Sequence, residues 1–161
     1  FTMNKRAEEK LGSRKTKVPN WYLDLSLLNK YWGSDRVYHH TAPVNSLYGL
    51  HEALVALKEE GLENSWKRHL DNHLMLREGL EKLGIDFLVD EQDRLPQLNA
   101  IYIPEGVEDL KSRQKLLNDF NLEIGAGLGV LAGKVWRIGL MGSSSNKNNI
   151  EYCLSSLQKV I

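Results

Sequence analysis

Residues 37–44 place two hydroxyl groups and two imidazoles directly before a predicted helix, in the order Tyr38, His39, His40 and Thr41. The first amides of a helix lack partners within the helix, and the helix dipole favours an anion near them. Hydroxyl groups beside such amides are suitable donors to a phosphate. The stretch therefore predicts a phosphate-binding loop. The residues fit a second interpretation, in which Thr41 is only a helix N-cap beside a packed tyrosine.

Residues 133–142 hold one arginine, Arg137, inside an otherwise apolar predicted strand. An arginine keeps its charge when buried, so it needs an anion, and its planar fork matches a carboxylate in a bidentate pair. The alternative is an arginine on the solvent face of an edge strand. Taken with residues 37–44, Arg137 indicates a ligand that carries a phosphate at one end and a carboxylate at the other.

Other patterns in the chain give weaker signals. His69 and His73 are four residues apart on a predicted helix, but the glutamate of a metalloprotease helix is missing, so we expect packing and no metal site. The glycines of residues 125–133 resemble a dinucleotide fingerprint, yet a strand-like run follows them where that motif needs a helix. The basic residues 13–17 lack interleaved aromatic residues and are typical of a solvated loop.

The composition is that of an ordinary globular protein. Of the 161 residues, 42% are hydrophobic and 26% are charged, and 21 Lys and Arg balance 21 Asp and Glu. We therefore expect neither nucleic acid nor a membrane as a partner, since no net charge attracts them and no apolar run reaches the roughly 20 residues of a membrane span. Cys153 is the only cysteine, which excludes internal disulfides and favours a reducing, intracellular compartment.

The order of predicted elements indicates an α+β fold. Helices are expected over residues 3–11, 21–32, 41–60, 62–83 and 107–120 and after residues 143–146, and strands over residues 85–89, 98–103, 121–124 and 134–141. In the helix of residues 62–83, one face is expected to carry Leu62, Trp66, His73, Leu76, Leu80 and Leu83. In the helix of residues 107–120, Leu110, Leu117 and Phe120 are expected to point inward. Gly61 marks the expected boundary between a helical first part and an α+β second part.

Six short blocks of the sequence, in this order, resemble the carboxy-terminal part of the alanine–glyoxylate / serine–pyruvate aminotransferase family. They are Ser-Arg-Lys-Thr-Lys at 13–17, Trp-Tyr-Leu-Asp at 21–24, Tyr-His-His-Thr at 38–41, Glu-Gly-Leu-Glu-Asn-Ser-Trp at 60–66, Gly-Leu-Gly at 127–129 and Trp-Arg-Ile-Gly-Leu at 136–140. Members of this family are class V, fold-type I enzymes that use pyridoxal phosphate. The resemblance covers nearly the whole chain.

The resemblance implies a role for each candidate residue. Tyr38 and Thr41 would bind the cofactor phosphate of the neighbouring subunit, which implies a homodimer with shared active sites, and Arg137 would hold the substrate α-carboxylate. Residues 1–60 would be the remainder of the large cofactor domain with the interdomain helix, and residues 61–161 the small α+β domain. No catalytic residue is expected in this chain, because the family's Schiff-base lysine lies upstream. His39 and His40 receive no role.

The function implied is the transfer of an amino group from alanine or serine to glyoxylate or pyruvate. The amino donor stays open, because ureidoglycine–glyoxylate and hydroxykynurenine transaminases are related members of the family. Since the chain begins at Phe1 and lacks the lysine, we expect a piece of a longer enzyme that is inactive by itself. The alternative is a non-catalytic folding or dimerisation unit. The compartment would be the cytoplasm in a bacterium, or a peroxisome or mitochondrion in a eukaryote.

Overall fold

A computed structural model describes residues 2–161, which form two compact units. The first unit ends at Ala53 and the second comprises Leu54–Ile161. The boundary between them falls inside helix α3 (Val44–Glu60).

The first unit consists of short helices held by side-chain caps. Helix α1 (Lys5–Gly12) begins after Asn4, and helix α2 (Leu25–Trp32) begins after Asp24, whose carboxylate accepts a hydrogen bond from the Ser26 amide at 3.0 Å. The single helix expected over residues 21–32 is therefore divided. A 3-10 turn at Trp21–Leu23 precedes α2, because the capping Asp24 has an extended backbone. Among residues 2–53, only the side chain of His39 is buried.

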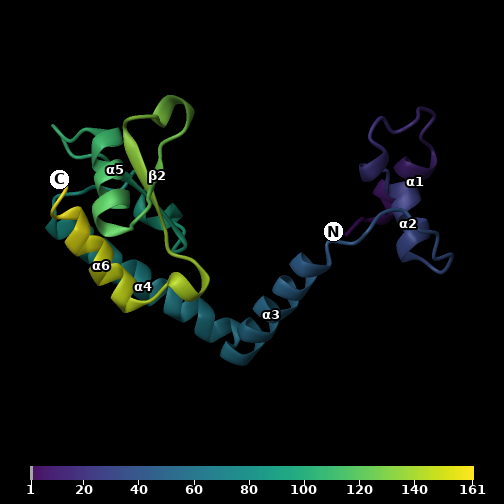
Figure 1. The fold of residues 1–161 in the computed structure, drawn as a ribbon, viewed down its shortest axis with the longest axis horizontal. Coiled ribbons are helices and arrows are strands. Elements are labelled where there is room, and N and C mark those ends of the chain that lie inside the picture. Colours follow the sequence, from purple (N-terminus) through teal and green to yellow (C-terminus); the bar gives the residue numbers. More distant parts are fainter. Residues whose placement is uncertain (1) are drawn as a thin grey trace. The chain divides into compact units, whose positions relative to one another are not determined.

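The second unit is a three-stranded antiparallel sheet with helices packed on it, which confirms the predicted α+β class (Figure 1). Its elements in chain order are α4 (Leu62–Lys82), β1 (Leu98–Tyr102), α5 (Asp109–Phe120), β2 (Gly125–Ala126), β3 (Val135–Gly139) and α6 (Lys147–Leu157). The strand order is β1-β3-β2, so β3 is the central strand. Helices α4 and α6 lie side by side in the unit.

The core of the second unit is built around β3. Trp136 and Ile138 alternate along the strand and both are buried, with Trp136 wholly inaccessible. They pack with apolar residues from α4, α5 and α6: Leu76, Leu80, Leu116, Ile150 and Leu157. Because side chains alternate along a strand, Val135, Arg137 and Gly139 belong to the opposite face of the sheet.

Two of the four expected strands are wrong. Residues 85–89 make only an isolated bridge between Phe87 and Ile101, although backbone hydrogen bonds from Leu88 to Ala100 and from Tyr102 to Asp86 keep the segment along the outer edge of β1. Residues 121–124 contain no strand, because Asn121 adopts the left-handed conformation that ends α5, at φ 49°. The strand comes later, at Gly125–Ala126.

Two predicted helix faces are also wrong in part. On α5 the buried residues are Ser112 and Leu116, whereas Leu110 and Leu117 are about half exposed. On α4 the expected burial of His73 and Leu76 is confirmed, but Leu62 and Trp66 are exposed. The first turns of α4 instead bury Ser65 and His69. Both ring nitrogens of His69 are hydrogen-bonded, which compensates for the burial of this side chain.

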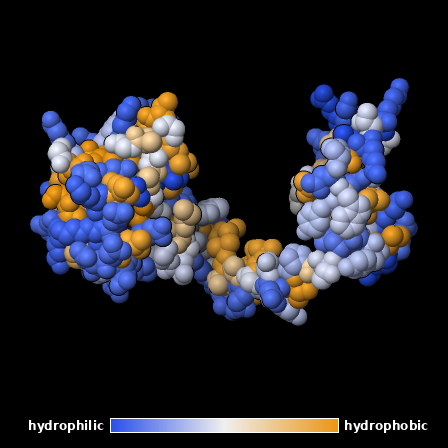
Figure 2. Space-filling view, turned by 45° about the horizontal axis from the view of Figure 1, so that its top comes forward, coloured by the Kyte–Doolittle hydropathy of each residue, from blue (hydrophilic) through white to orange (hydrophobic). Residues whose placement is uncertain are grey.

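Helix α3 has no buried residue within the part of the chain that the structure describes. Its leucines Leu47, Leu50 and Leu54 are each about half exposed, and Figure 2 shows hydrophobic residues on the surface along this helix. No helix between residues 2 and 161 combines the length and the apolar content that would allow it to cross a bilayer.

One polar group links the core tryptophan to α5. The Trp136 indole N–H donates to Asp109 Oδ1 at 2.8 Å, and Arg113 Nε donates to the same oxygen at 2.7 Å. The hydrogen bond from Arg113 is the main cause that holds the pKa of the Asp109 carboxyl below its usual value, and the bond from Trp136 lowers the pKa further, against the effect of burial. The ionised Asp109 therefore stabilises the fold.

We predict that Asp109→Asn lowers the free energy of unfolding at neutral pH by about 1–3 kcal/mol, because a charge-assisted hydrogen bond is lost. A depressed folded-state pKa gives a contribution that is full above the unfolded pKa and disappears as the pH falls through the folded value. The difference between wild type and variant should therefore shrink below about pH 4. Urea unfolding at several pH values measures it. Asp119→Asn, at an exposed position of α5, is the control and should change stability by less than about 0.5 kcal/mol.

Candidate functional site

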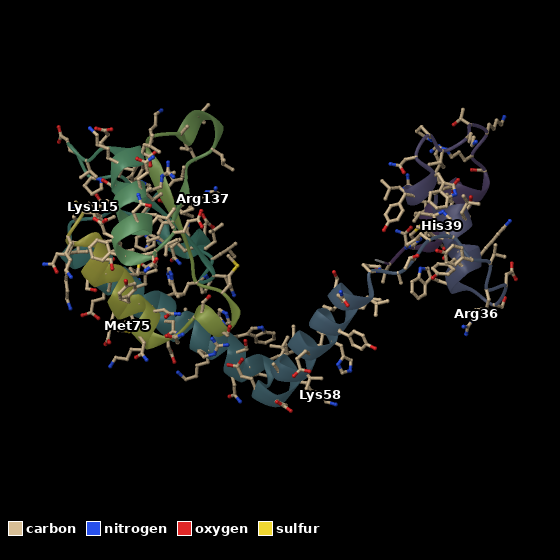
Figure 3. The ribbon with its side chains drawn as sticks, viewed as in Figure 1. Arg36, His39, Lys58, Met75, Lys115 and Arg137 are labelled. Atoms are coloured by element: carbon tan, nitrogen blue, oxygen red, sulfur yellow. The ribbon has the colours of Figure 1, made fainter. Side chains whose placement is uncertain are left out.

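Arg137 lies on the face of the sheet opposite the core, in the middle of β3 (Figure 3). Its direct partners across the sheet are Ala100 on β1 and Gly125 on β2. Directly opposed residues in antiparallel strands share a face, so the arginine is flanked by the two smallest side-chain types. Neither neighbour carries a side chain long enough to cover the guanidinium.

The guanidinium of Arg137 is oriented by one hydrogen bond. Its Nε donates to the carbonyl oxygen of Ala126 at 2.8 Å. A Cβ built on Gly125 would lie 3.4 Å from the NH2 nitrogen, so the fork lies directly over this glycine. Within residues 2–161, the two terminal nitrogens have no hydrogen-bond partner and no acidic group within ion-pair distance. The arginine thus offers a fixed, uncompensated fork that suits a carboxylate.

The chain that leaves β3 is fixed to helix α4. The Gly142 amide donates to His69 Nε2 at 3.1 Å, and Arg68 donates to the carbonyl oxygens of Gly142 and Ser145 at 2.9 and 2.8 Å. The same guanidinium binds both oxygens of Glu60, and these bonds hold the pKa of that carboxyl below its usual value. These contacts hold the end of the strand that carries Arg137.

The segment before β3 is a tight loop that depends on Gly127. The Gly127 amide donates to the Val135 carbonyl at 2.9 Å, and a Cβ at this glycine would lie 2.0 Å from the Leu131 carbonyl oxygen. No other residue type fits there without a backbone shift. A strand follows the loop, so the helix that a dinucleotide fingerprint requires is not present after Gly133.

Tyr38 and Thr41 lie next to each other in the first unit. Their hydroxyl oxygens are 2.9 Å apart, and both side chains are exposed. The expectation that Thr41 caps the helix is wrong, because α3 begins at Val44 and the Leu47 amide donates to the Pro43 carbonyl. Thr41 is instead paired with Tyr38, and the two hydroxyls form a small polar cluster just before the helix. Such a cluster can donate to the oxygens of an anion.

The two histidines of α4 are engaged by the protein. His69 Nδ1 donates to the Ser65 carbonyl at 2.7 Å while its Nε2 accepts from Gly142, which leaves no nitrogen for a metal. His73 Nδ1 donates to the Asn99 amide oxygen at 2.7 Å. Among residues 2–161, no group of three His, Cys, Asp or Glu side chains has the geometry of a metal site.

The structure places Tyr38 and Thr41 together in the first unit and Arg137 in the second. Sequence reasoning missed three features of the Arg137 site, namely the Ala126 carbonyl and the flanking Ala100 and Gly125. Their proximity follows from the register of the three strands, and no local pattern reports a register between strands far apart in sequence. The glycine-rich composition of residues 125–133 was the one available signal.

Comparison with known proteins identifies relatives over the entire chain. The chain is 41% identical to alanine–glyoxylate aminotransferase of Callithrix jacchus over 159 residues, which is 96% of this chain and 38% of the relative. The crystal structure of alanine–glyoxylate aminotransferase from Nostoc sp. matches with a TM-score of 0.94 and 52% identity, over 99% of this chain and 42% of that one. That of ureidoglycine–glyoxylate aminotransferase from Bacillus subtilis matches with a TM-score of 0.92 and 36% identity, over 99% and 41%.

The matches cover only a part of each relative. The chain spans about two-fifths of the length of these proteins, as the shares of 38%, 42% and 41% show. The matched region is the carboxy-terminal part of their fold. No protein-family model matches the chain.

We predict that Gly127→Ala lowers the free energy of unfolding by about 1–3 kcal/mol, because the new methyl group must displace the Leu131 carbonyl. Gly125→Ala is the matched control, since its methyl group meets Arg137 only at ordinary contact distances of 3.4–3.5 Å. The control should change stability by less than about 1 kcal/mol. Denaturant unfolding of both variants measures the difference, and equal effects would contradict the steric account of this loop.

Proposed function

Since this chain belongs to the alanine–glyoxylate aminotransferase family and matches the carboxy-terminal part of its fold, we propose that the polypeptide that carries it is a pyridoxal-phosphate-dependent aminotransferase. The observation that carries the proposal is the uncompensated guanidinium of Arg137. Its Nε is fixed by the Ala126 carbonyl, so its outer nitrogens are pre-oriented for an anion. The proposed reaction moves an amino group from alanine or serine to glyoxylate or pyruvate.

In this proposal Arg137 binds the α-carboxylate that every amino-acid and 2-oxo-acid substrate carries. A bidentate pair fixes both the position and the plane of the carboxylate, which a single lysine contact would not do. Ala100 and Gly125 leave the space that the substrate backbone needs beside the guanidinium. Because the same carboxylate is present in donor and acceptor, one arginine serves both halves of the reaction.

The donor set at Tyr38 and Thr41 fits the phosphate of pyridoxal phosphate. The two exposed hydroxyls are 2.9 Å apart, and Thr41 lies three residues before the first residue of α3. Anions are stabilised at such helix starts. When bound, this cofactor supplies the electron sink that amino-group transfer requires. We propose that these two residues bind the cofactor phosphate of a neighbouring subunit, so that a homodimer shares its active sites.

The remaining machinery is proposed to lie upstream of this chain. It comprises the lysine that binds the cofactor, the acid that pairs with its ring nitrogen and the aromatic residue beside the ring. Residues 1–60 then belong to the large domain with the interdomain helix, and residues 61–161 form the small domain. By itself the 161-residue chain would have no turnover. It would supply the arginine that binds the substrate carboxylate and the two hydroxyls that bind the cofactor phosphate.

A related reaction has specific support. The relative from Bacillus subtilis acts, by its name, on ureidoglycine and glyoxylate. Ureidoglycine carries the same α-carboxylate, so Arg137 would bind it in the same manner. The two proposals differ only in the residues that contact the rest of the amino donor.

We predict that Arg137→Met in the full polypeptide raises the KM for alanine about a hundredfold, with a smaller change in kcat, because ground-state and transition-state binding of the carboxylate are both lost. Arg137→Lys should recover only part of the affinity, since it keeps the charge and loses the fork. Steady-state kinetics with alanine and glyoxylate measure both variants. Arg6→Met, an exposed arginine in α1, is the control and should leave KM unchanged. A KM equal to that of the wild type in Arg137→Met would remove the assignment.

We predict that Tyr38→Phe and Thr41→Val each weaken pyridoxal phosphate binding about tenfold, because each variant loses one hydrogen bond to a charged group. Binding of pyridoxal, which has no phosphate, should not change. Cofactor titration followed by absorbance separates the two ligands. Tyr48→Phe, at an exposed position on α3, is the matched control. An equal loss of pyridoxal affinity would instead indicate a general disturbance of the site.

A further inference from the structure

Two adjacent imidazoles are hydrogen-bonded to each other in the connection between α2 and α3. His39 Nδ1 and His40 Nδ1 are 2.9 Å apart, and His39 Nε2 is 3.1 Å from the Trp21 carbonyl oxygen. Among residues 2–53, His39 is the only buried side chain, with 7% of its surface exposed. These two rings take no part in the proposed carboxylate binding by Arg137 or in the proposed phosphate binding by Tyr38 and Thr41.

The geometry fixes where the protons are. A carbonyl oxygen only accepts, so His39 Nε2 must carry a hydrogen and donate it to Trp21. A neutral His39 then has a bare Nδ1, which must accept its hydrogen bond from the Nδ1–H of His40. One further proton can enter without breaking this bond, for example at His40 Nε2. A second one would put two N–H groups face to face, so the bonded pair carries at most one positive charge.

The surroundings of the pair are aromatic, with one acidic group. Trp21 stacks on His39 with ring centroids 4.0 Å apart, and the rings of Tyr22 and Tyr31 lie 4.8 and 5.5 Å from His40. The carboxylate of Asp24 accepts a hydrogen bond from the Ser26 hydroxyl and is close enough to interact electrostatically with His39. Asp24 is the one acidic group among these neighbours, and its negative charge attracts a positive charge on the pair.

The pair is connected to the two hydroxyls of the proposed phosphate site. His39 and His40 are the two residues between Tyr38 and Thr41, whose hydroxyl oxygens are 2.9 Å apart. Tyr31 contacts both His40 and the edge of Tyr38, at centroid distances of 5.5 and 5.9 Å. The buried His39 thus anchors a segment whose two ends are the exposed donor groups.

We propose that His39 and His40 are positioning residues that share one proton, hold residues 38–41 in the shape that brings the Tyr38 and Thr41 hydroxyls together, and limit this segment to one positive charge. The role toward a phosphate depends on the proposed function. The shared proton does not, because it follows from the contacts of His39 with Trp21 and His40. Two different measurements therefore test the two parts.

The first measurement uses ¹⁵N NMR to monitor the protonation of the imidazole nitrogens in this chain from about pH 8 to about pH 5. Resonances of the pair are identified by their loss in His39 and His40 variants. We expect the two rings together to take up one proton, with His39 Nε2 protonated throughout. Two protons taken up while the resonances of Tyr38 and Thr41 stay unchanged would overturn the proposal.

The second measurement compares two substitutions of His40 in the full polypeptide. His40→Phe keeps a ring against Tyr22 and Tyr31 but has no donor, and should weaken pyridoxal phosphate binding about tenfold. His40→Asn places an amide N–H where Nδ1–H was, and should restore the affinity to within about twofold. Affinity for pyridoxal should be the same in all three proteins.

The outcomes separate the two proposals. If His40→Phe binds the cofactor like the wild type, or if His40→Asn fails as badly as His40→Phe, the hydrogen bond between the histidines has no positioning role. If the wild-type polypeptide binds no pyridoxal phosphate, the proposed function fails, and the claim that the pair serves a phosphate fails with it. In either case, the number of protons taken up in the NMR titration tests whether the two rings share one proton.

Discussion

The burial of Trp136 is the constraint on which the second unit depends. This side chain is wholly inaccessible and contacts the helices from one face of the central strand, so the alternation of β3 places Arg137 on the opposite face. Its indole N–H also joins the strand to the start of α5 through Asp109. A shift of β3 by one residue would expose the tryptophan and bury the arginine beside the core, at a cost of several kcal/mol. The site is therefore kept in place by the core.

The elements that were predicted well are those whose signals are local. Strand β3, helix α4 and the last helix come from long periodic runs that end at glycines or polar caps. The predicted strand over residues 121–124 failed because Asn121 turns left-handed, and the two-residue strand β2 is too short to leave a pattern. The prediction of the buried face of α5 failed because Leu110, Leu116 and Leu117 define two overlapping apolar faces. Only the packing of Leu116 against the core decides which face is buried.

The site was predictable in its chemistry and not in its geometry. An arginine in an apolar strand indicates an anion from the sequence alone, and the resemblance to a family supplied a carboxylate as that anion. Ala126 orients the guanidinium, and Ala100 and Gly125 leave it room, because of strand pairings between residues far apart in the sequence. The mutual bond of His39 and His40 was likewise invisible, because two adjacent histidines in a loop have many possible orientations.

The edges of the small sheet have a consequence for how this chain associates. On one side, the backbone of residues 86–88 is already hydrogen-bonded along β1, and on the other side β2 offers only two residues. Neither edge is a long row of free amide and carbonyl groups, which is what a strand from another molecule needs as a template. Edge-to-edge addition and growth into cross-β fibrils are therefore disfavoured in the folded state. Association of folded molecules must use side-chain surfaces, such as the exposed leucines of α3.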